Sequence, residues 1–170
     1  EQALAIDREI GYRQGEGISA RLATLFQKDL RKIRLAYSIM LTLTGTPIIY
    51  YGDEFGKGND DAFYQEMLAR TGYPDSRYLV RGRINWSRVE RNLQQPDTLA
   101  HQVYSSLRAM IHTRQAHPAF SRGMLEFVHF PNTNKTHSSN ILAYRRIFED
   151  EHRLVIHNLS TQEQQLDVDD

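Results

Sequence analysis

Apolar residues recur at helical spacing in the first half of the chain. From Asp29, a suitable N-cap residue, they repeat every three or four positions until Gly45. They are Leu30, Ile33, Ala36, Tyr37, Met40, Leu41 and Leu43. The pattern predicts a helix that begins at Asp29 and ends before Gly45, because glycine readily terminates helices. Residues 1–28 carry several glycines and predict only short helical or irregular pieces.

A continuous apolar run, Pro47-Ile48-Ile49-Tyr50-Tyr51, follows the helix and stops at Gly52-Asp53-Glu54. It lacks the alternation of apolar and polar residues that marks a strand with one solvent-exposed face. We therefore expect a strand buried on both faces, as in parallel sheets. In parallel α/β folds the chemistry lies at the carboxyl ends of the strands. The acids after this run therefore indicate a polar site.

Helices and then short strands are predicted beyond this point. A short helix is expected over 62–70, after the polar stretch that begins at Lys57. A longer helix should begin at Pro96 and Asp97, carry an apolar stripe to Arg114 and end at Pro118. The strands are expected over 125–130, 141–148, 153–157 and 164–168. Such a series predicts an antiparallel sheet or sandwich.

Composition narrows the classes of partner. The 21 basic and 21 acidic residues cancel to a net charge of +0, which gives no electrostatic reason to expect nucleic acid or an anionic membrane. A neutral substrate fits better. No apolar stretch approaches the roughly 20 residues of a membrane span. The chain has no cysteine, so disulfides are excluded and the redox compartment is left open. We expect a cytoplasmic location.

The run Gly45-Thr46-Pro47-Ile48-Ile49-Tyr50-Tyr51-Gly52-Asp53-Glu54 resembles the eighth barrel strand of glycoside hydrolase family 13, the α-amylase family. The resemblance extends upstream through 17–23 and 29–33, which are similar to trehalose synthases. It extends downstream through 75–81 and 85–88, which look like the loop after the eighth strand in amylosucrases. Arg-Gly-Arg-Ile-Asn-Trp at 81–86 departs from the Arg-Thr-Pro-Met-Gln-Trp of many α-glucosidases.

The resemblance implies an α/β plus all-β chain: the C-terminal portion of a (β/α)8 TIM barrel followed by an antiparallel β-sandwich domain. Residues 1–120 would belong to the barrel, with a loop excursion over 57–95, and residues 121–170 to the sandwich. A whole barrel needs about 250 residues, and the chain has 170 and starts without methionine. We therefore expect a fragment whose partner is the missing N-terminal part of the barrel.

Asp53 and Glu54 are the two adjacent acids that could form a catalytic pair. A retaining glycosidase needs two carboxylates about 5 to 5.5 Å apart, on opposite sides of the scissile bond. Adjacent residues on an extended chain point in opposite directions, so these two do not suit that task. We expect them to fix the loop through backbone and arginine hydrogen bonds, with direct sugar contact as the alternative. The resemblance places the catalytic carboxylates upstream, so this chain alone should be inactive.

Arg81 and then Arg77 are the candidate substrate-binding residues, because related exo-acting enzymes place an arginine of this loop near the terminal glucose. A guanidinium spans two neighbouring hydroxyls. The alternative is a surface ion pair. Asn59 joins Asp53 and Glu54 as a further candidate for substrate binding. Trp86 is interpreted as a packing anchor, with sugar stacking as the alternative.

Two classes of function remain after these steps. The first is a retaining α-glucoside hydrolase or transglucosidase, of trehalose synthase, amylosucrase or α-amylase/α-glucosidase type. The second is a non-catalytic carbohydrate-binding or interaction module formed by the sheet after Ser121. The histidines lack the spacing of a zinc site, and Asn59-Asp60-Asp61 lacks the glycine and glutamate of a calcium loop. No cofactor is expected in this chain, and calcium in the full-length enzyme is left open.

Overall fold

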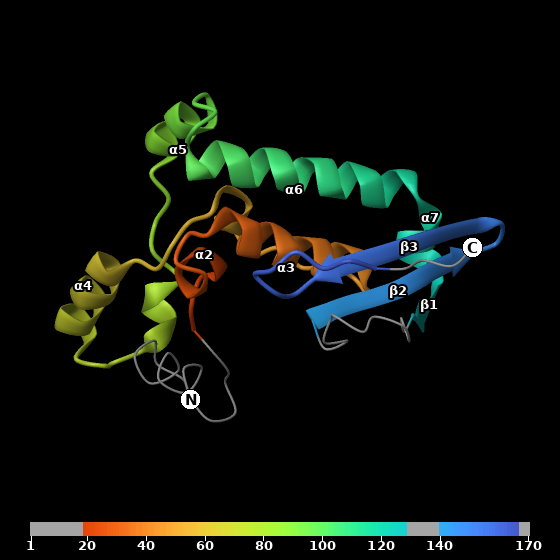
Figure 1. The fold of residues 1–170 in the computed structure, drawn as a ribbon. Helices are drawn as coiled ribbons and strands as arrows, with labels where there is room; N and C mark the ends of the chain where they lie inside the picture. The colour runs from red at the N-terminus through yellow and green to blue at the C-terminus, as the bar shows by residue number, and fades with distance from the viewer. Residues whose placement is uncertain (1–18, 129–139, 167–170) are drawn as a thin grey trace. The chain divides into compact units, whose positions relative to one another are not determined.

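The computed structural model describes residues 19–128 and 140–166. Its helices are α2 (Leu22–Leu25), α3 (Leu30–Thr42), α4 (Asp61–Thr71), α5 (Trp86–Leu93), α6 (Leu99–Ala116) and α7 (Pro118–Arg122), with single 3₁₀ turns at η1 (Asp53–Phe55) and η2 (Ser76–Leu79). Its strands are β1 (Met124–Phe127), β2 (Ile141–Phe148) and β3 (Glu151–Asn158) (Figure 1). The short pieces expected within residues 1–18 and the last two residues of the strand expected over 125–130 lie outside the described residues.

The chain divides into two compact units. One comprises residues 1–34 and 49–107, and the other comprises 35–48 and 108–170. Helices α3 and α6 contribute residues to both units. This division reflects packing within the chain. The boundary expected at Ser121, between barrel and sandwich, is a different one and stays a prediction.

The predicted helices form with local end signals. Asp29 accepts a hydrogen bond from the Arg31 amide at 2.9 Å, which caps the first turn of α3. Asp60 caps α4 by accepting from the Phe63 amide at 3.0 Å. The cap of α6 is Thr98 and not Asp97, because the Thr98 hydroxyl accepts from the His101 amide at 3.2 Å. These helices confirm the sequence pattern to within a residue or two.

The predicted strand over 47–51 is not formed in the described structure. Residues 46–50 belong to no helix or strand, and the side chain of Ile48 is 82% exposed. A strand requires neighbours that accept and donate its backbone hydrogen bonds. No strand of the described residues lies beside this segment, so the expectation of a buried strand is wrong for the chain as it stands.

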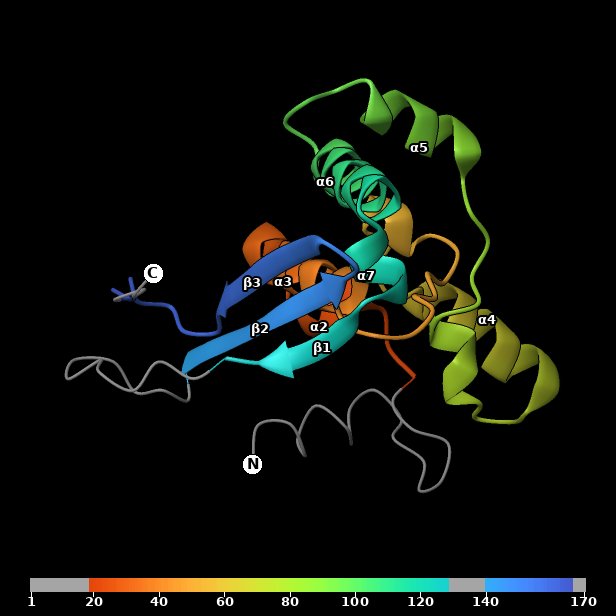
Figure 2. The ribbon, with the colours of Figure 1, turned by 90° about the vertical axis from the view of Figure 1, so that its right-hand side faces the viewer.

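The second unit contains an antiparallel sheet in the order β1-β2-β3, as the sequence predicted. Figure 2 shows the three strands side by side, and β2 and β3 pair from Ile141↔Asn158 to Phe148↔Glu151. Tyr144 and Val155 face Phe120 of α7, with partly buried leucines around them: Leu43, Leu125 and Leu142. Residues 164–166 are not in a strand, and 167–170 lie outside the described residues. The structure therefore shows one sheet, and a sandwich is not shown.

A polar cluster joins the sheet to the end of α3 within this unit. Tyr144 Oη lies 2.7 Å from Thr42 Oγ1 and 3.3 Å from His157 Nε2. The buried guanidinium of Arg146 donates to the carbonyls of Thr42 and Gly123 at 2.6 and 2.8 Å. Arg114 of α6 donates to further carbonyls of the same segment, those of Leu41, Leu43 and Gly45. Two arginines thus satisfy carbonyls that a helix end leaves unpaired.

Candidate functional site

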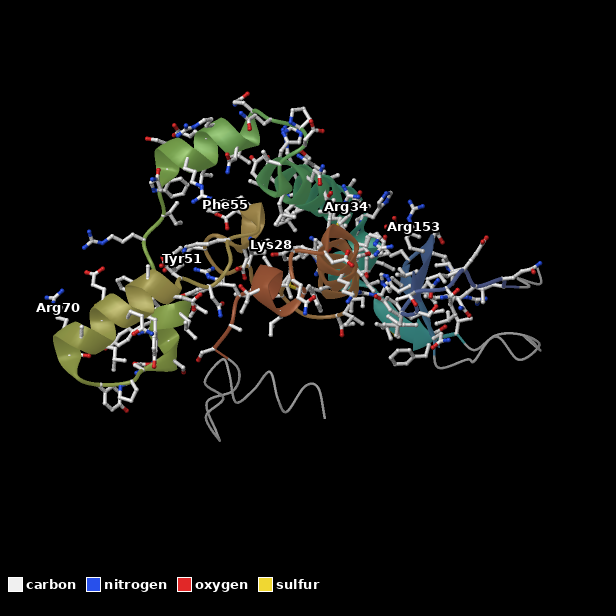
Figure 3. The ribbon with its side chains drawn as sticks, turned by 60° about the vertical axis from the view of Figure 1, so that its left-hand side comes forward. Lys28, Arg34, Tyr51, Phe55, Arg70 and Arg153 are labelled. Carbon is white, nitrogen blue, oxygen red and sulfur yellow. The ribbon has the colours of Figure 1, made fainter. Side chains whose placement is uncertain are left out.

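A tight turn of the first unit follows the apolar run 47–51. Gly52 has a φ of +92° and Gly56 a φ of +69°, which glycine adopts without strain. The amide of Lys57 donates to the Gly52 carbonyl at 2.9 Å, which closes the turn. Glu54 accepts a hydrogen bond from the Gly52 amide at 2.5 Å. The two glycines and Glu54 thus direct the chain back on itself, with Phe55 buried inside (Figure 3).

Arg21 is the centre of this site, although the sequence reasoning did not select it. Its side chain is 1% exposed. Its guanidinium donates to the Asp53 carboxylate at 3.0 Å and to the main-chain carbonyls of Tyr51 and Val80. Its backbone amide donates to the Asn59 side chain at 2.8 Å. One arginine therefore connects the turn at 51–53, the start of the loop at 59 and the loop residue before Arg81.

The aromatic rings of the apolar run complete the surroundings of Arg21. The guanidinium carbon lies 4.6 Å from the ring centroid of Tyr50 and 4.8 Å from that of Tyr51. A guanidinium over an aromatic face gains electrostatic attraction, and more so when water is excluded. Burial raises the pKa of the Tyr51 hydroxyl. Tyr51, labelled in Figure 3, therefore contributes both its carbonyl and its ring to the arginine.

Asp53 shows how burial and pairing compete. Burial raises the pKa of the Asp53 carboxyl above its ordinary value of 3.8, and the hydrogen bond and charge of Arg21 only partly offset this. Burial thus raises the pKa of Asp53 and Arg21 lowers it. Burial prevails because the carboxylate is largely withdrawn from water. Asp53 is thus a structural partner of Arg21, and Glu54 points instead to the Gly52 amide. These hydrogen bonds confirm that both acids fix the loop, although the two residues lie in the 3₁₀ turn η1 and not on the extended chain from which we predicted it.

The two candidate arginines differ sharply. Arg77 holds the buried carboxylate of Asp75: its Nε donates to both oxygens at 2.9 Å, and its Nη2 donates to Oδ2 at 2.6 Å. Its side chain therefore has a structural task already. Arg81 is exposed, and its side chain makes no hydrogen bond or ion pair with residues 19–128 or 140–166. The ion-pair interpretation thus applies to Arg77, and Arg81 has a guanidinium available for a ligand.

Comparison with known proteins gives the context for this geometry. No family model matches the chain. The chain is 31% identical to α-amylase 3 of Dictyoglomus thermophilum, over 82% of this chain and 28% of that protein. It is 30% identical to trehalose synthase of Thermus thermophilus, over 92% of this chain and 17% of that protein. The chain belongs to glycoside hydrolase family 13, the α-amylase family. It spans less than a third of the length of either relative.

Solved structures of other proteins agree with this family 13 assignment. The α-amylase from H. orenii superposes with a TM-score of 0.54 at 27% identity, over 90% of this chain and 32% of that one. A debranching enzyme from Nostoc punctiforme gives a TM-score of 0.56 at 24% identity, over 84% of this chain and 23% of that one, which shows a shared fold alone. The family 13 chain therefore carries part of the architecture of much longer proteins.

Trp86 is the remaining candidate of this family 13 chain. It begins α5, a helix that the sequence pattern did not indicate, and its side chain is 57% exposed. Its ring meets the edge of Phe55 at a centroid distance of 6.2 Å. The indole thus packs on Phe55, as the packing interpretation expected, while more than half of its surface stays exposed.

Within the described residues, no group of three or more histidine, cysteine, aspartate or glutamate side chains is arranged to hold a metal ion. The helices of the same residues include none that is long and apolar enough to cross a membrane. Arg21 escaped the sequence reasoning because it lies 32 positions from Asp53. The signal that could have found it was an arginine inside the run 17–23, which the family resemblance already contained.

Proposed function

We propose that this chain is part of a retaining enzyme that acts on α-glucosidic bonds as a hydrolase or transglucosidase. The observation that carries the proposal is the match to an amylase and to trehalose synthases over most of this chain. Because the chain spans only a fraction of those proteins, the activity would belong to a longer polypeptide. Its substrate would be an α-glucoside or oligosaccharide, in keeping with the net charge of +0.

In this proposal the chain contributes the last barrel strand, the pocket loop and the start of a C-terminal sandwich. The side chains of Ile48, Tyr50 and Tyr51 are exposed on an extended segment without a strand partner among the described residues. Flanking barrel strands from the rest of the enzyme would cover them and pair with their backbone. Leu154 and Ile156 are likewise exposed on β3, which suits a second sheet over that strand.

The catalytic carboxylates would come from the rest of the enzyme. Asp53 is engaged by Arg21 and Glu54 by the Gly52 amide, so neither faces a common point as nucleophile and acid would. Arg81 would bind the sugar, because its guanidinium has no partner in the described part of the chain. Arg77, Asp53, Glu54 and Asn59 would shape the pocket around it. Calcium in the full-length enzyme and a cytoplasmic location stay predictions.

The test is to assay the purified full-length protein with maltose, trehalose, sucrose and starch. We expect turnover of at least one of them, and the products separate hydrolysis from transfer. Arg81→Ala should raise the KM about tenfold, the factor expected for a lost charged hydrogen bond. Arg70→Ala, an exposed arginine of α4 (Figure 3), is the matched control and should leave the KM unchanged.

Two results would contradict the proposal. Absence of turnover with every α-glucoside tested would exclude the activity itself. Clear turnover by the purified chain of residues 1–170 alone would show that its own carboxylates perform the reaction. The second result would return Asp53 and Glu54 to the catalytic role from which their hydrogen bonds now exclude them.

A further inference from the structure

We propose that Arg21 is a positioning residue that fixes Arg81 by holding the main-chain carbonyl of Val80. The inference rests on the proposed function, because Arg81 is there the sugar-binding residue. Arg21 Nη2 donates to the Val80 carbonyl, and Val80 directly precedes Arg81. The two positions are separated by 59 residues in the sequence, so this bond crosses from one segment of the unit to another.

The other contacts of Arg21 determine where that carbonyl is held. Nη1 of the same guanidinium binds Asp53 at 3.0 Å and the Tyr51 carbonyl. The guanidinium is planar, so fixing Nη1 on the turn also fixes the direction in which Nη2 points. The rings of Tyr50 and Tyr51 lie alongside it and restrict its remaining freedom. The Arg81 backbone is therefore located relative to the Gly52–Gly56 turn through one rigid group.

Local hydrogen bonds hold the same loop less firmly. The Arg81 amide reaches the Tyr78 carbonyl at 3.4 Å, and the Val80 amide reaches the Arg77 carbonyl at 3.2 Å. Both distances are long for N–H···O bonds, and both bonds stay within η2 and its end. The Tyr51 hydroxyl lies 3.5 Å from the Val80 carbonyl, at the limit of a hydrogen bond. The Asp60 amide holds the neighbouring Leu79 carbonyl at 2.8 Å, so that part of the loop is fixed without Arg21. Loss of the Arg21 guanidinium would thus release the Val80 carbonyl and the backbone that follows it to Arg81.

The test compares Arg21→Met and Arg21→Lys in the full-length protein, with Arg34→Met as the matched control. Arg34, labelled in Figure 3, is an arginine of α3 that binds the Ser106 hydroxyl at 2.7 Å. Hydrogen exchange measures the loop directly. In Arg21→Met, we expect exchange at the amides of 52–57 and 80–81 to accelerate roughly tenfold. Exchange in β2 and β3 should stay unchanged, and Arg34→Met should match the wild type throughout.

Kinetics connects the loop to binding. Arg21→Met should raise the KM for the α-glucoside and lower kcat less than twofold, since Arg21 would act through the position of Arg81. The double variant Arg21→Met/Arg81→Ala should be no worse than Arg81→Ala alone, because both changes remove one contact. Arg21→Lys keeps the positive charge but lacks the planar guanidinium with its two Nη donors. It should therefore recover exchange protection only in part.

The outcomes separate this inference from the proposed function. If the wild type turns over no α-glucoside, exchange still reports whether Arg21 holds the Val80 carbonyl. If the wild type is active but Arg21→Met leaves exchange at 80–81 unchanged, the positioning role is excluded. Additive effects on the KM would also overturn it, because they would mean that Arg21 and Arg81 act independently.

Discussion

The carboxylate of Asp53 lies beside a guanidinium that water hardly reaches. Asp53→Ala should therefore lower the free energy of unfolding by about 1–3 kcal/mol, because it leaves the buried charge of Arg21 without its counter-charge. Chemical denaturation measures the change. Glu66→Ala, an exposed acid of α4, is the control and should stay within about 0.5 kcal/mol of the wild type. Equal effects of the two changes would show that the ion pair contributes nothing.

His157 gives a prediction of pH dependence. Burial lowers the pKa of His157 below its ordinary value of 6.5, so the folded chain favours the neutral imidazole. A histidine whose pKa is lower in the folded than in the unfolded state makes its full contribution to folding stability at pH values above the unfolded pKa. That contribution is lost as the pH falls below 6.5 toward the folded pKa. The second unit should accordingly become less stable as the pH falls from about 7.5 to about 5.5, one unit either side of the ordinary histidine pKa.

His157→Gln should reduce this loss, because glutamine does not titrate and its amide can still reach the Tyr144 hydroxyl, which lies 3.3 Å from the imidazole. The measurement is the denaturant midpoint of wild type and variant at both pH values. His112→Gln, at an exposed position of α6, serves as control and should retain the wild-type dependence. An unchanged slope in His157→Gln would exclude His157 as its cause.

At these residues, the sequence predicted the structural role of a side chain better than the residue that it contacts. The adjacency of Asp53 and Glu54 correctly predicted that they face different groups. The identity of the arginine could not be predicted, because a contact over 32 positions depends on how the chain returns to itself. The same limit applies to the two candidate arginines, of which Arg81 was placed ahead of Arg77 without a partner for either. Only the structure shows that Asp75 occupies Arg77.

At the scale of elements, the turn around Gly56 can be tested with a matched glycine. Gly56 and Gly72 have φ angles of +69° and +68°, so alanine is strained at both. A Cβ at Gly56 would also lie 3.3 Å from the Leu99 side chain of α6, whereas at Gly72 it would meet nothing within 4 Å. Gly72→Ala should cost about 1 kcal/mol of stability, and Gly56→Ala should cost more.

The difference between the two variants, read from chemical denaturation, measures the packing of the turn against α6. A Gly56→Ala variant no less stable than Gly72→Ala would mean that Leu99 moves aside at no cost. Leu99→Ala combined with Gly56→Ala provides a further control. It removes the obstacle and should bring the cost of the alanine at 56 back toward that at 72, because the two changes are then coupled.

Helices and antiparallel strands were predictable because their signals are local. The apolar stripe of α3, the aspartate caps and the alternation in β2 and β3 all lie within about a dozen residues of what they specify. The segment 47–51 was not predictable in the same way. Its composition specifies a strand, but a strand also needs partners, and the described residues do not supply them. Helix α5 was missed because it has only eight residues, mostly polar, and Trp86, Val89 and Leu93 are its only apolar ones.

At the scale of the whole molecule, Ile48 distinguishes the chain from the longer enzyme of which we propose it is part. Its side chain is exposed here, so Ile48→Lys should change the stability of residues 1–170 by less than about 0.5 kcal/mol. In the full-length protein, neighbouring strands would cover the position. The same change should then cost more than about 3 kcal/mol, because it buries an unpaired charge.

Thermal or denaturant unfolding of both proteins provides the measurement. Thr44→Lys, a change at an exposed position close to the same segment, is the control and should be tolerated in both. If Ile48→Lys has the same small effect in the full-length protein, no strand covers that side chain. The proposed place of this segment in a barrel would then be wrong.

The arginine contacts at the end of α3 bear on how this chain tolerates inherited change. Arg114 and Arg146 bind main-chain carbonyls of residues 41–45, and every amino acid provides the same carbonyl. A substitution at the exposed Thr44 therefore leaves these contacts intact, whereas a one-residue deletion there would shift every acceptor away from its donor. Homologous genes should accordingly vary at position 44 while keeping the length of this segment.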